Sequence, residues 1–522
     1  MYVIGFDLGT TAFKAALFDR HGRCISRATE PCSVDYPQSG WAEQDAHEWW
    51  RQAGSLTQTI LSQSNIAPDE IAALAFASQM CGLISVDTNG DVTHPAMIWL
   101  DTRSHQEARQ LVAGVINVLG YGLTAAAQWL SLCHGAPSLS GREFISKIHW
   151  LRRYRPDVWE RSNRHMDVKD FMVFRATGEA TTSPDCAHLT WLMNARKRKW
   201  SPALMRRAKI EQNRLPAIQA CDAPIGDGLT PNAARHLGLN PGTKVVCGAG
   251  DILAAALGAG ATGLGQVHIS IGTSNWMAAH IPKPKVSPFT LIGSIAAAQK
   301  DRYLLIAAQE NFGNALIKVA NLMGVEGDAD IAVQKLIALA AVAPAGANGL
   351  LFLPWLSGER VPVDETFLRG GFANLSLEHT REDMARAVLE GLAYNLSWAA
   401  GHFFTLSNPP SDFTIPVVGG LANSDLIMQI LADVLERRLG RATDPQWAGA
   451  RGAFISAAVS LGWRSSFDDP ACNIENDNVF SPNRDVHDLH QKRFEAFKAY
   501  YSNNRRWHRR LNNPTNDDRP DR

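Results

Sequence analysis

The chain has 522 residues, which exceeds the usual size of one domain, so two or three domains are expected. Apolar residues make up 45% of the sequence, as in a globular protein with large cores. The 51 Lys and Arg residues balance 51 Asp and Glu residues, so bulk charge indicates neither a nucleic-acid partner nor a membrane partner. Any phosphate group must therefore be bound by local features.

The eight cysteines are spread singly along the chain. No pair has CxxC spacing and none lies close to a pair of histidines, which argues against a zinc site and a disulfide framework. Free thiols fit the reducing cytoplasm, and the first residues have the pattern of a strand rather than a signal peptide. One long uncharged stretch, residues 336–357, is interrupted by Pro and Gly, which predicts a helix end, a turn and a buried strand instead of a membrane span.

The first elements alternate strands with helices. Residues 2–7 and 13–18 are apolar runs joined by Gly9-Thr10-Thr11, the pattern of a β-hairpin. Amphipathic helices are predicted near residues 46–62 and 103–112, and further strands near residues 71–77 and 82–86. This mixture predicts an α/β fold.

A second strand, residues 267–271, ends in Gly272-Thr273-Ser274 and so resembles the end of the first strand. Two similar strand ends half a chain apart suggest two related lobes that face each other. We expect an N-terminal lobe of residues 1–247 and a C-terminal lobe of residues 248–502.

The C-terminal lobe has clear helix signals. Thr380-Arg381-Glu382-Asp383 is a capping box that predicts the start of a helix. A last amphipathic helix is predicted over residues 489–501, and the polar residues 503–522 are predicted to form a disordered tail. The basic cluster at residues 505–510 fits a solvated helix end better than a nucleic-acid patch, since the whole chain is neutral.

Gly-Thr turns at strand ends suit phosphate binding, because Gly allows close approach and Thr hydroxyls donate hydrogen bonds. Each turn could equally be an ordinary tight turn. The facing pair, with a lysine nearby, favours phosphate binding. The residues concerned are Thr10, Thr11, Lys14, Gly272 and Thr273.

Gly419-Gly420 before a helix that begins at Ser424 is a third candidate phosphate site. A helix N-terminus favours anions, and paired glycines let a flat or charged group lie against the backbone. The same pattern is common in plain loops between a strand and a helix, so both interpretations stay open.

Asp251 follows a strand and Gly248-Ala249-Gly250, and it precedes the apolar helical run 252–258. A carboxylate is rarely found in so apolar a stretch unless it has a structural or functional role. Local sequence favours a helix N-cap, which Asp performs well, and the functional alternative is a general base.

A sugar site needs donors and acceptors beside a rigid wall. Gln79-Met80-Cys81 follows one predicted strand, and Trp99 and Asp101 follow another. Trp99 would more often be a core residue and Asp101 a helix cap, but their place at neighbouring strand tips favours binding.

Together these residues match a known family. The matching motifs are residues 5–11 with Lys14, residues 40–45 with Trp49-Trp50, Trp99 with Asp101 and Arg103, Lys169-Asp170, residues 248–251, residues 270–274, residues 353–362, residues 389–391 and Gly419-Gly420. In this order the chain resembles the FGGY carbohydrate kinases, and within them it is most similar to the xylulokinases. The resemblance runs from residue 2 to about residue 501.

The resemblance implies two ribonuclease-H-like lobes, as in actin and hexokinase, with the active site in a central cleft. It implies ATP with Mg²⁺, a small sugar as substrate, and Asp251 as the catalytic base. Met80, Cys81 and Asp251 would contact the sugar, while Asp7 would orient the metal. Thr10, Thr11, Gly272, Thr273 and Gly420 would lie around the nucleotide.

The chain departs from the xylulokinase pattern at three places. Cys81 replaces a usual His, and a thiol is a weak hydrogen-bond donor. Leu100 replaces a usual Asn, and Gly419-Gly420-Leu421-Ala422-Asn423 replaces a usual Gly-Gly-Gly-Ala-Arg. Xylulose is therefore the first expected substrate, with another ketopentose, gluconate or a polyol as alternatives.

Two other classes compete on the same fold. A chaperone-type ATPase would need a separate peptide-binding domain, for which the chain lacks room. A non-catalytic sugar sensor would lose the base, whereas Asp251 is present. No nucleic acid or membrane is expected as a partner, and a homodimer stays open.

Overall fold

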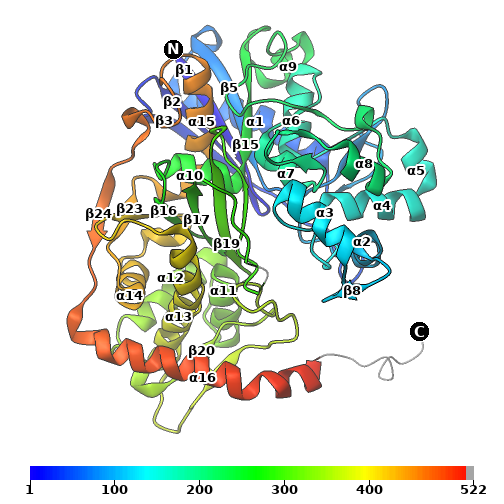
Figure 1. Cartoon of the computed structure of the whole chain (residues 1–522). Coiled ribbons are helices and arrows are strands. Elements are labelled where there is room, and N and C mark those ends of the chain that lie inside the picture. Colours follow the sequence, from blue (N-terminus) through cyan, green and yellow to red (C-terminus); the bar gives the residue numbers. More distant parts are fainter. Residues whose placement is uncertain (288, 513–522) are drawn as a thin grey trace.

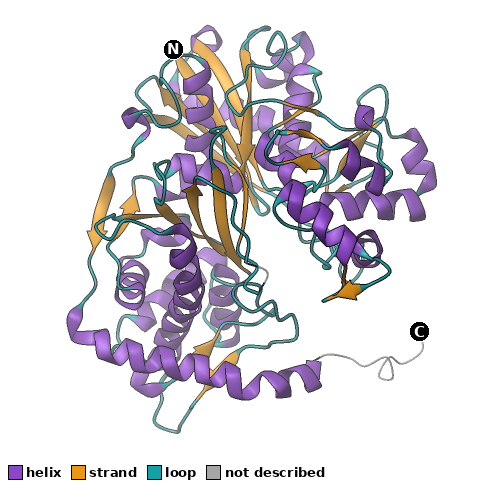
Figure 2. Ribbon diagram, in the orientation of Figure 1, coloured by secondary structure: helices purple, strands orange, loops and turns teal. Residues whose placement is uncertain are grey.

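The computed structural model describes residues 1–287 and 289–512 and consists of two sheet-centred lobes (Figures 1 and 2). The five-stranded sheet of the first lobe has the order β15-β5-β1-β2-β3. Its strands are β1 (Tyr2–Leu8), β2 (Ala12–Asp19), β3 (Cys24–Pro31), β5 (Ile71–Ser78) and β15 (Lys244–Gly250). The predicted first hairpin is confirmed, since β1 and β2 pair antiparallel around the Gly-Thr turn.

The seven-stranded sheet of the second lobe has the order β18-β19-β17-β16-β22-β23-β24. Its strands are β16 (Val267–Ile271), β17 (Asn275–Ile281), β18 (Gly293–Ala296), β19 (Tyr303–Gln309), β22 (Ile415–Val418), β23 (Leu439–Ala442) and β24 (Asn476–Phe480). In both sheets a hairpin pairs with a third antiparallel strand on one side and two successive parallel strands on the other. The two related lobes predicted from the repeated strand ends are thus confirmed, and with them the α/β two-lobed fold class.

Two helices of small residues lie between the sheets. α10 (Asp251–Gly258) packs on α15 (Ala448–Ser460), and α15 also covers β1, β5 and β15 beside the N-terminus (Figure 1). The backbones approach so closely that a Cβ on Gly452 would lie 1.9 Å from the carbonyl oxygen of Ala254. One buried cluster contains apolar residues of both sheets and both helices, so it joins the lobes at their base.

Further helices cover the outer faces. In the first lobe these are α1 (Ala46–Ser64), α6 (Val168–Thr177) and α9 (Pro231–Leu237), with a side group of α2 (His105–Val112), α3 (Leu123–Cys133), α4 (Phe144–Tyr154) and α8 (Pro202–Ala208). In the second lobe they are α11 (Gly313–Leu322), α12 (Ala329–Ala340), α13 (Arg381–Ser407) and α14 (Asp425–Leu435). The predicted capping box is confirmed: Thr380 caps α13, and Asp383 closes the box.

The C-terminal helix corrects the predicted disordered tail. α16 runs from His487 to Asn512, so residues 503–512 are helical, while the rest of that tail lies outside the described residues. Arg505 pairs with Glu365, and the Asn512 side chain donates to the Phe367 carbonyl at 3.1 Å. The prediction of disorder was based on the polar composition of this segment. It did not foresee that the basic side of the helix would pair with an acidic residue in a distant loop. In the described part of the chain, no helix has the length and apolar character needed to span a membrane.

Candidate functional site

Strand register brings the predicted site residues of the first lobe to one edge. Parallel pairing aligns Asp7 with Ala77 and Ala77 with Ala249, and in the next row Leu8 with Ser78 and Ser78 with Gly250. The residues that follow are Gly9, Gln79 and Asp251, so the predicted phosphate turn, the predicted sugar loop and the predicted base leave neighbouring strand tips. Binding sites in open parallel sheets form at such carboxyl ends.

The first Gly-Thr turn is linked to the sugar loop by side chains. The Thr10 hydroxyl accepts from Trp99 Nε1 at 2.9 Å and donates to Gln79 Oε1 at 3.1 Å. Gln44, which belongs to the family motif at residues 40–45, accepts from Gln79 Nε2 at 2.7 Å and donates to the Thr10 carbonyl at 2.9 Å. Thr11 is exposed, whereas Thr10 is half-buried.

Asp7 and Lys14 face each other across the first hairpin. Burial raises the pKa of Asp7, and the nearby Lys14 charge opposes that rise. Lys14 Nζ donates to the Gln446 carbonyl at 3.0 Å, and a Cβ on Gly449 would lie 2.3 Å from Asp7 Oδ2. The start of α15 therefore closes over Asp7, which no sequence motif indicated.

The second Gly-Thr turn is held from within its own lobe. Gly272 N–H donates to the Ser274 carbonyl at 2.9 Å, and Phe312 and Asn314 N–H groups donate to the Thr273 carbonyl at 3.3 and 3.1 Å. A Cβ on Gly313 would lie 2.5 Å from the Gly272 carbonyl oxygen. This close contact fixes the turn while leaving Thr273 exposed.

The glycine pair lies next to the second turn. β22 runs parallel to β16 in register, so Gly419-Gly420 and Gly272 leave neighbouring strand ends. Gly419 has φ of 95°, and a Cβ there would lie 2.3 Å from the Ile271 carbonyl oxygen, so only glycine fits. A Cβ on Gly420 would meet nothing within 4 Å, which leaves room for a ligand. Ser424 caps α14 by accepting from Ile427 N–H at 3.3 Å.

Asp251 is the first residue of α10, and the N-cap is Gly250. The helix-cap interpretation of Asp251 is therefore wrong. Its Oδ1 accepts from Ile252 N–H at 2.9 Å. Burial raises the pKa of Asp251 to about 8, with a further contribution from the charge of Asp7. A carboxyl group with such a pKa at a strand end suits proton transfer near neutral pH.

Met80 and Cys81 lie beside this carboxyl group. A Cβ on Gly250 would lie 2.3 Å from Met80 Sδ, so the Met80 side chain packs directly against the backbone that leads into Asp251. Cys81 has φ of 63°; its N–H donates to Asp167 at 3.0 Å, and its carbonyl accepts from Lys147 Nζ at 2.7 Å. Burial raises the pKa of the Cys81 thiol.

Asp167 and Lys147 hold the backbone of the predicted sugar loop, and sequence reasoning missed both. Asp167 caps α6 and also accepts from Gly82 N–H at 2.8 Å, while burial and the charge of Asp170 raise the pKa of Asp167 to about 7. Lys147 also donates to the Ile98 carbonyl at 2.7 Å. Asp167 and Lys147 thus fix the loops that carry Cys81 and Trp99. This role is visible only from their contacts in the folded structure.

Trp99 is half-buried at the site rather than a core residue. Asp101 is fully buried, and its oxygens accept from Ala42 N–H at 2.8 Å and from Arg103 Nε at 2.8 Å. Asp101 therefore lies behind Trp99, which forms the predicted sugar wall with the loop of Gln79, Met80 and Cys81, while Ser104 is the N-cap of α2. A direct contact of Asp101 with sugar stays a prediction.

This arrangement defines a class. Each of the two duplicated lobes has a Gly-Thr turn at the end of a strand, and a carboxyl group with a raised pKa lies beside a polar loop, as suits phosphoryl transfer to a hydroxyl. Comparison with known sequences specifies the family. Residues 2–258 match the N-terminal domain of the FGGY family of carbohydrate kinases, and residues 267–461 match its C-terminal domain. The chain belongs to this family and is an ATP-dependent carbohydrate kinase.

Individual relatives cover nearly the whole chain. A xylulose kinase of Staphylococcus epidermidis is 28% identical over 96% of each chain. A gluconokinase of Bacillus subtilis is 26% identical over 90% of this chain and 89% of its own. The crystal structure of ligand-bound xylulose kinase from Lactobacillus acidophilus superimposes with a TM-score of 0.84 at 25% identity, covering 98% and 99% of the two chains.

Proposed function

We propose that the chain phosphorylates D-xylulose to xylulose 5-phosphate, with Asp251 as the general base. The observation that carries the proposal is the position of Asp251, which follows the tip of β15 directly beside the tip of β5 that leads to Met80-Cys81, with β1 and Asp7 next in the sheet. Relatives that are named xylulose kinases and align along almost the whole chain support the choice of sugar. The free cysteines fit a cytoplasmic enzyme.

In this proposal the sugar binds against Trp99 and the loop of Gln79, Met80 and Cys81, with its reactive hydroxyl towards Asp251. A sugar hydroxyl is a poor nucleophile at neutral pH, and its proton must leave as it attacks the γ-phosphorus. Asp251 accepts that proton in its ionised form. Loss of solvent at the start of α10 keeps the pKa of Asp251 near the working pH, so the group can take up and release the proton in each cycle.

The phosphates of ATP would lie between the two Gly-Thr turns. Thr11 and Thr273 are the exposed hydroxyl donors, Lys14 supplies a positive charge, and the open face of Gly420 admits the rest of the nucleotide. The hydroxyls and the ammonium group can donate hydrogen bonds to an anion, and the glycine lets the anion approach the backbone closely. Thr10 acts indirectly, because its hydroxyl already binds Trp99 and Gln79.

Asp7 fits a magnesium ion that arrives with ATP. Mg²⁺ is usually held by one or two carboxylates together with substrate phosphates, so a single partly exposed carboxylate beside a phosphate turn is sufficient. When bound, the ion would neutralise charge on the transferred phosphoryl group. The raised pKa of Asp7 in the free chain marks a carboxylate that gains from a cation.

Gluconate is the second candidate, supported by the gluconokinase relative and by Cys81, which replaces the usual His of the xylulokinases. A coupled assay of ADP release over D-xylulose, D-ribulose, D-gluconate and glycerol tests the choice. We expect the highest kcat/KM for D-xylulose. A higher value for any other compound would replace xylulose as the substrate and leave the kinase class intact.

A further inference from the structure

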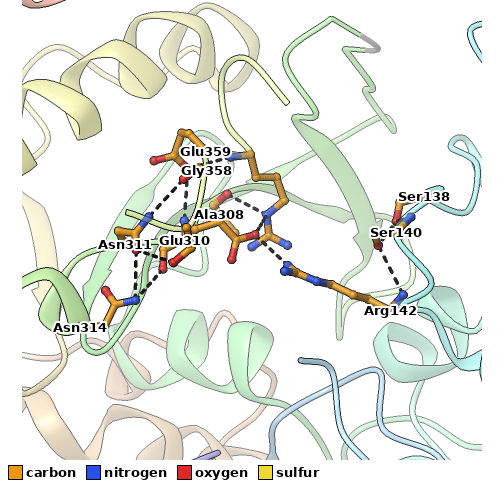
Figure 3. Close-up of polar contacts among 11 residues, drawn as sticks. Ser138, Ser140, Arg142, Ala308, Glu310, Asn311, Asn314, Gly358 and Glu359 are labelled. Carbon is orange, nitrogen blue, oxygen red and sulfur yellow. Dashed lines mark hydrogen bonds and ion pairs between the residues drawn. The ribbon is translucent and has the colours of Figure 1, made fainter. Parts of the chain in front are cut away.

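An ion pair joins the two lobes beside the proposed site. Arg142, in the loop before α4, places Nη1 2.8 Å from Oε1 of Glu310, which follows β19 in the other lobe (Figure 3). Arg360 Nε lies 3.5 Å from the same oxygen and donates to the Ala308 carbonyl at 3.2 Å. Glu310 is thus shared between a cation of its own lobe and a nearer cation of the opposite lobe.

On the first lobe, Arg142 belongs to the proposed sugar wall. Its guanidinium carbon lies 5.9 Å from the centre of the Trp99 ring. Its loop leads into the helix whose Lys147 holds the Cys81 carbonyl. Arg142 Nε is buried and has no hydrogen-bond acceptor among the described residues. One donor therefore remains available next to the wall where a sugar hydroxyl would lie.

On the second lobe, Glu310 belongs to the segment that holds the second Gly-Thr turn. Three residues after it, Gly313 N–H donates to the Gly272 carbonyl at 3.0 Å. The Glu310 backbone is itself fixed, since its N–H donates to Glu359 Oε1 at 3.2 Å. Because the Glu310 segment and the Gly272-Thr273 turn are held together, a movement of Glu310 relative to Arg142 also moves this turn relative to the proposed sugar wall.

Burial and charge favour a persistent pair. The side chains of Arg142 and Glu310 are 30% and 14% exposed, so solvent screens them only partly. Burial acts to raise the pKa of Glu310, but Arg360 and Arg142 outweigh it and lower that pKa, so the carboxylate is charged at neutral pH. Charged groups in such surroundings interact more strongly than surface pairs do.

We propose that this ion pair couples sugar binding to alignment of ATP. Arg142 contacts the bound sugar through Nε, and Glu310 acts as a positioning residue that transmits the contact to the Gly272-Thr273 turn. The inference rests on the proposed function, because it needs the sugar at Trp99 and the phosphates at that turn. It predicts that bound sugar increases the affinity for ATP through these two side chains.

The test measures the dissociation constant of ATP with and without saturating D-xylulose, or D-gluconate if wild type prefers it. Coupling between two ligand sites typically changes affinity by about 5–150-fold. Glu310→Gln keeps the size and an acceptor but removes the charge. We expect it to reduce the sugar-induced gain to about twofold or less, while ATP affinity without sugar stays within about twofold of wild type. Arg142→Gln should have the same effect on the gain, and the double variant should lose no more than either single variant.

Asp468→Asn is the matched control, since Asp468 forms a 2.7 Å ion pair with Arg302 of similar exposure, 39% and 17%. It should keep the full gain. Equal gains in Glu310→Gln and wild type, or additive losses in the double variant, would overturn the coupling.

A measurement without substrate separates this inference from the proposed function. Small-angle scattering of the free chain should show a larger radius of gyration for Glu310→Gln than for wild type and Asp468→Asn, because the contact between lobes is lost. If neither sugar is phosphorylated, the substrate assignment fails, but scattering still tests whether the Arg142–Glu310 ion pair holds the lobes together. Equal radii for the three proteins would overturn the link itself.

Discussion

Replacing Asp251 by Asn separates its chemical role from its structural one. The amide keeps the shape of the side chain and an oxygen that can accept from Ile252 N–H, now 2.9 Å from Oδ1. It removes the ability to accept a proton from the sugar. Loss of a general base typically costs about 10²–10⁴-fold in rate, so kcat should fall at least a hundredfold while ATP and sugar still bind.

Although Asp251→Asn should lose activity, its folded state should be more stable than that of wild type at neutral and mildly alkaline pH. The pKa of Asp251 is raised from 3.8 to about 8, mainly by burial, so the native state holds a proton that the unfolded state has already released between those pH values. The carboxyl group therefore contributes stability below pH 4 that is lost as the pH rises towards 8. One pKa unit corresponds to about 1.4 kcal/mol, and since the side chain is only partly buried we expect about 1–3 kcal/mol in total.

Thermal melts at several pH values and steady-state assays measure both effects. Asp251→Asn should melt like wild type near pH 4 and at a progressively higher temperature than wild type up to pH 8. Asp328→Asn is a suitable control, because Asp328 caps α12 at an exposed position and Asn caps helices as well. A variant with near-wild-type kcat, or one that melts well below wild type at pH 8, would refute the assignment of Asp251 as a buried base.

Three further results are expected. Truncation after Asn503 should lower the melting temperature and kcat/KM, because the last turns of α16 hold the loop at Glu365, whereas truncation after Asn512 should change neither; equal behaviour of the two truncations would contradict this. Cys81→His should lower KM for D-xylulose with little change in kcat, because the backbone there is held by other residues and His adds a stronger donor; an unchanged KM counts against a sugar contact at this position. The kcat/KM of wild type should rise with pH and level off above about 8, since the base must be ionised, and a flat profile from pH 6 to 9 would argue for another base.

The sequence predicted those structural features of the candidate site and the fold that depend on local signals. Glycine and threonine at strand ends, the capping box at Thr380 and the carboxylate at the start of an apolar helix all act within a few residues. The repeated strand end was enough to predict two related lobes, because each turn closes its own hairpin. Hydrophobic periodicity placed the first helix within two residues of its end at Ser64.

The missed features all depend on contacts between distant segments. Asp167 and Lys147 support Cys81 from 86 and 66 residues away. The position of Asp167 as the cap of α6 is a local signal, but its contact with the Cys81 backbone is not. The last turns of α16 look like a polar tail until Glu365, 140 residues earlier, is placed beside Arg505. The conformation of the Cys81 loop and of the end of α16 thus depends on tertiary contacts that local composition does not reveal.

Phosphorus NMR of the wild-type reaction with ATP, Mg²⁺ and D-xylulose tests the central claim most directly. We expect a sugar phosphomonoester signal that grows in proportion to ADP, and no such signal with Asp251→Asn over the same period. ADP formed with inorganic phosphate in place of the sugar phosphate, or a normal product signal from Asp251→Asn, would contradict the account.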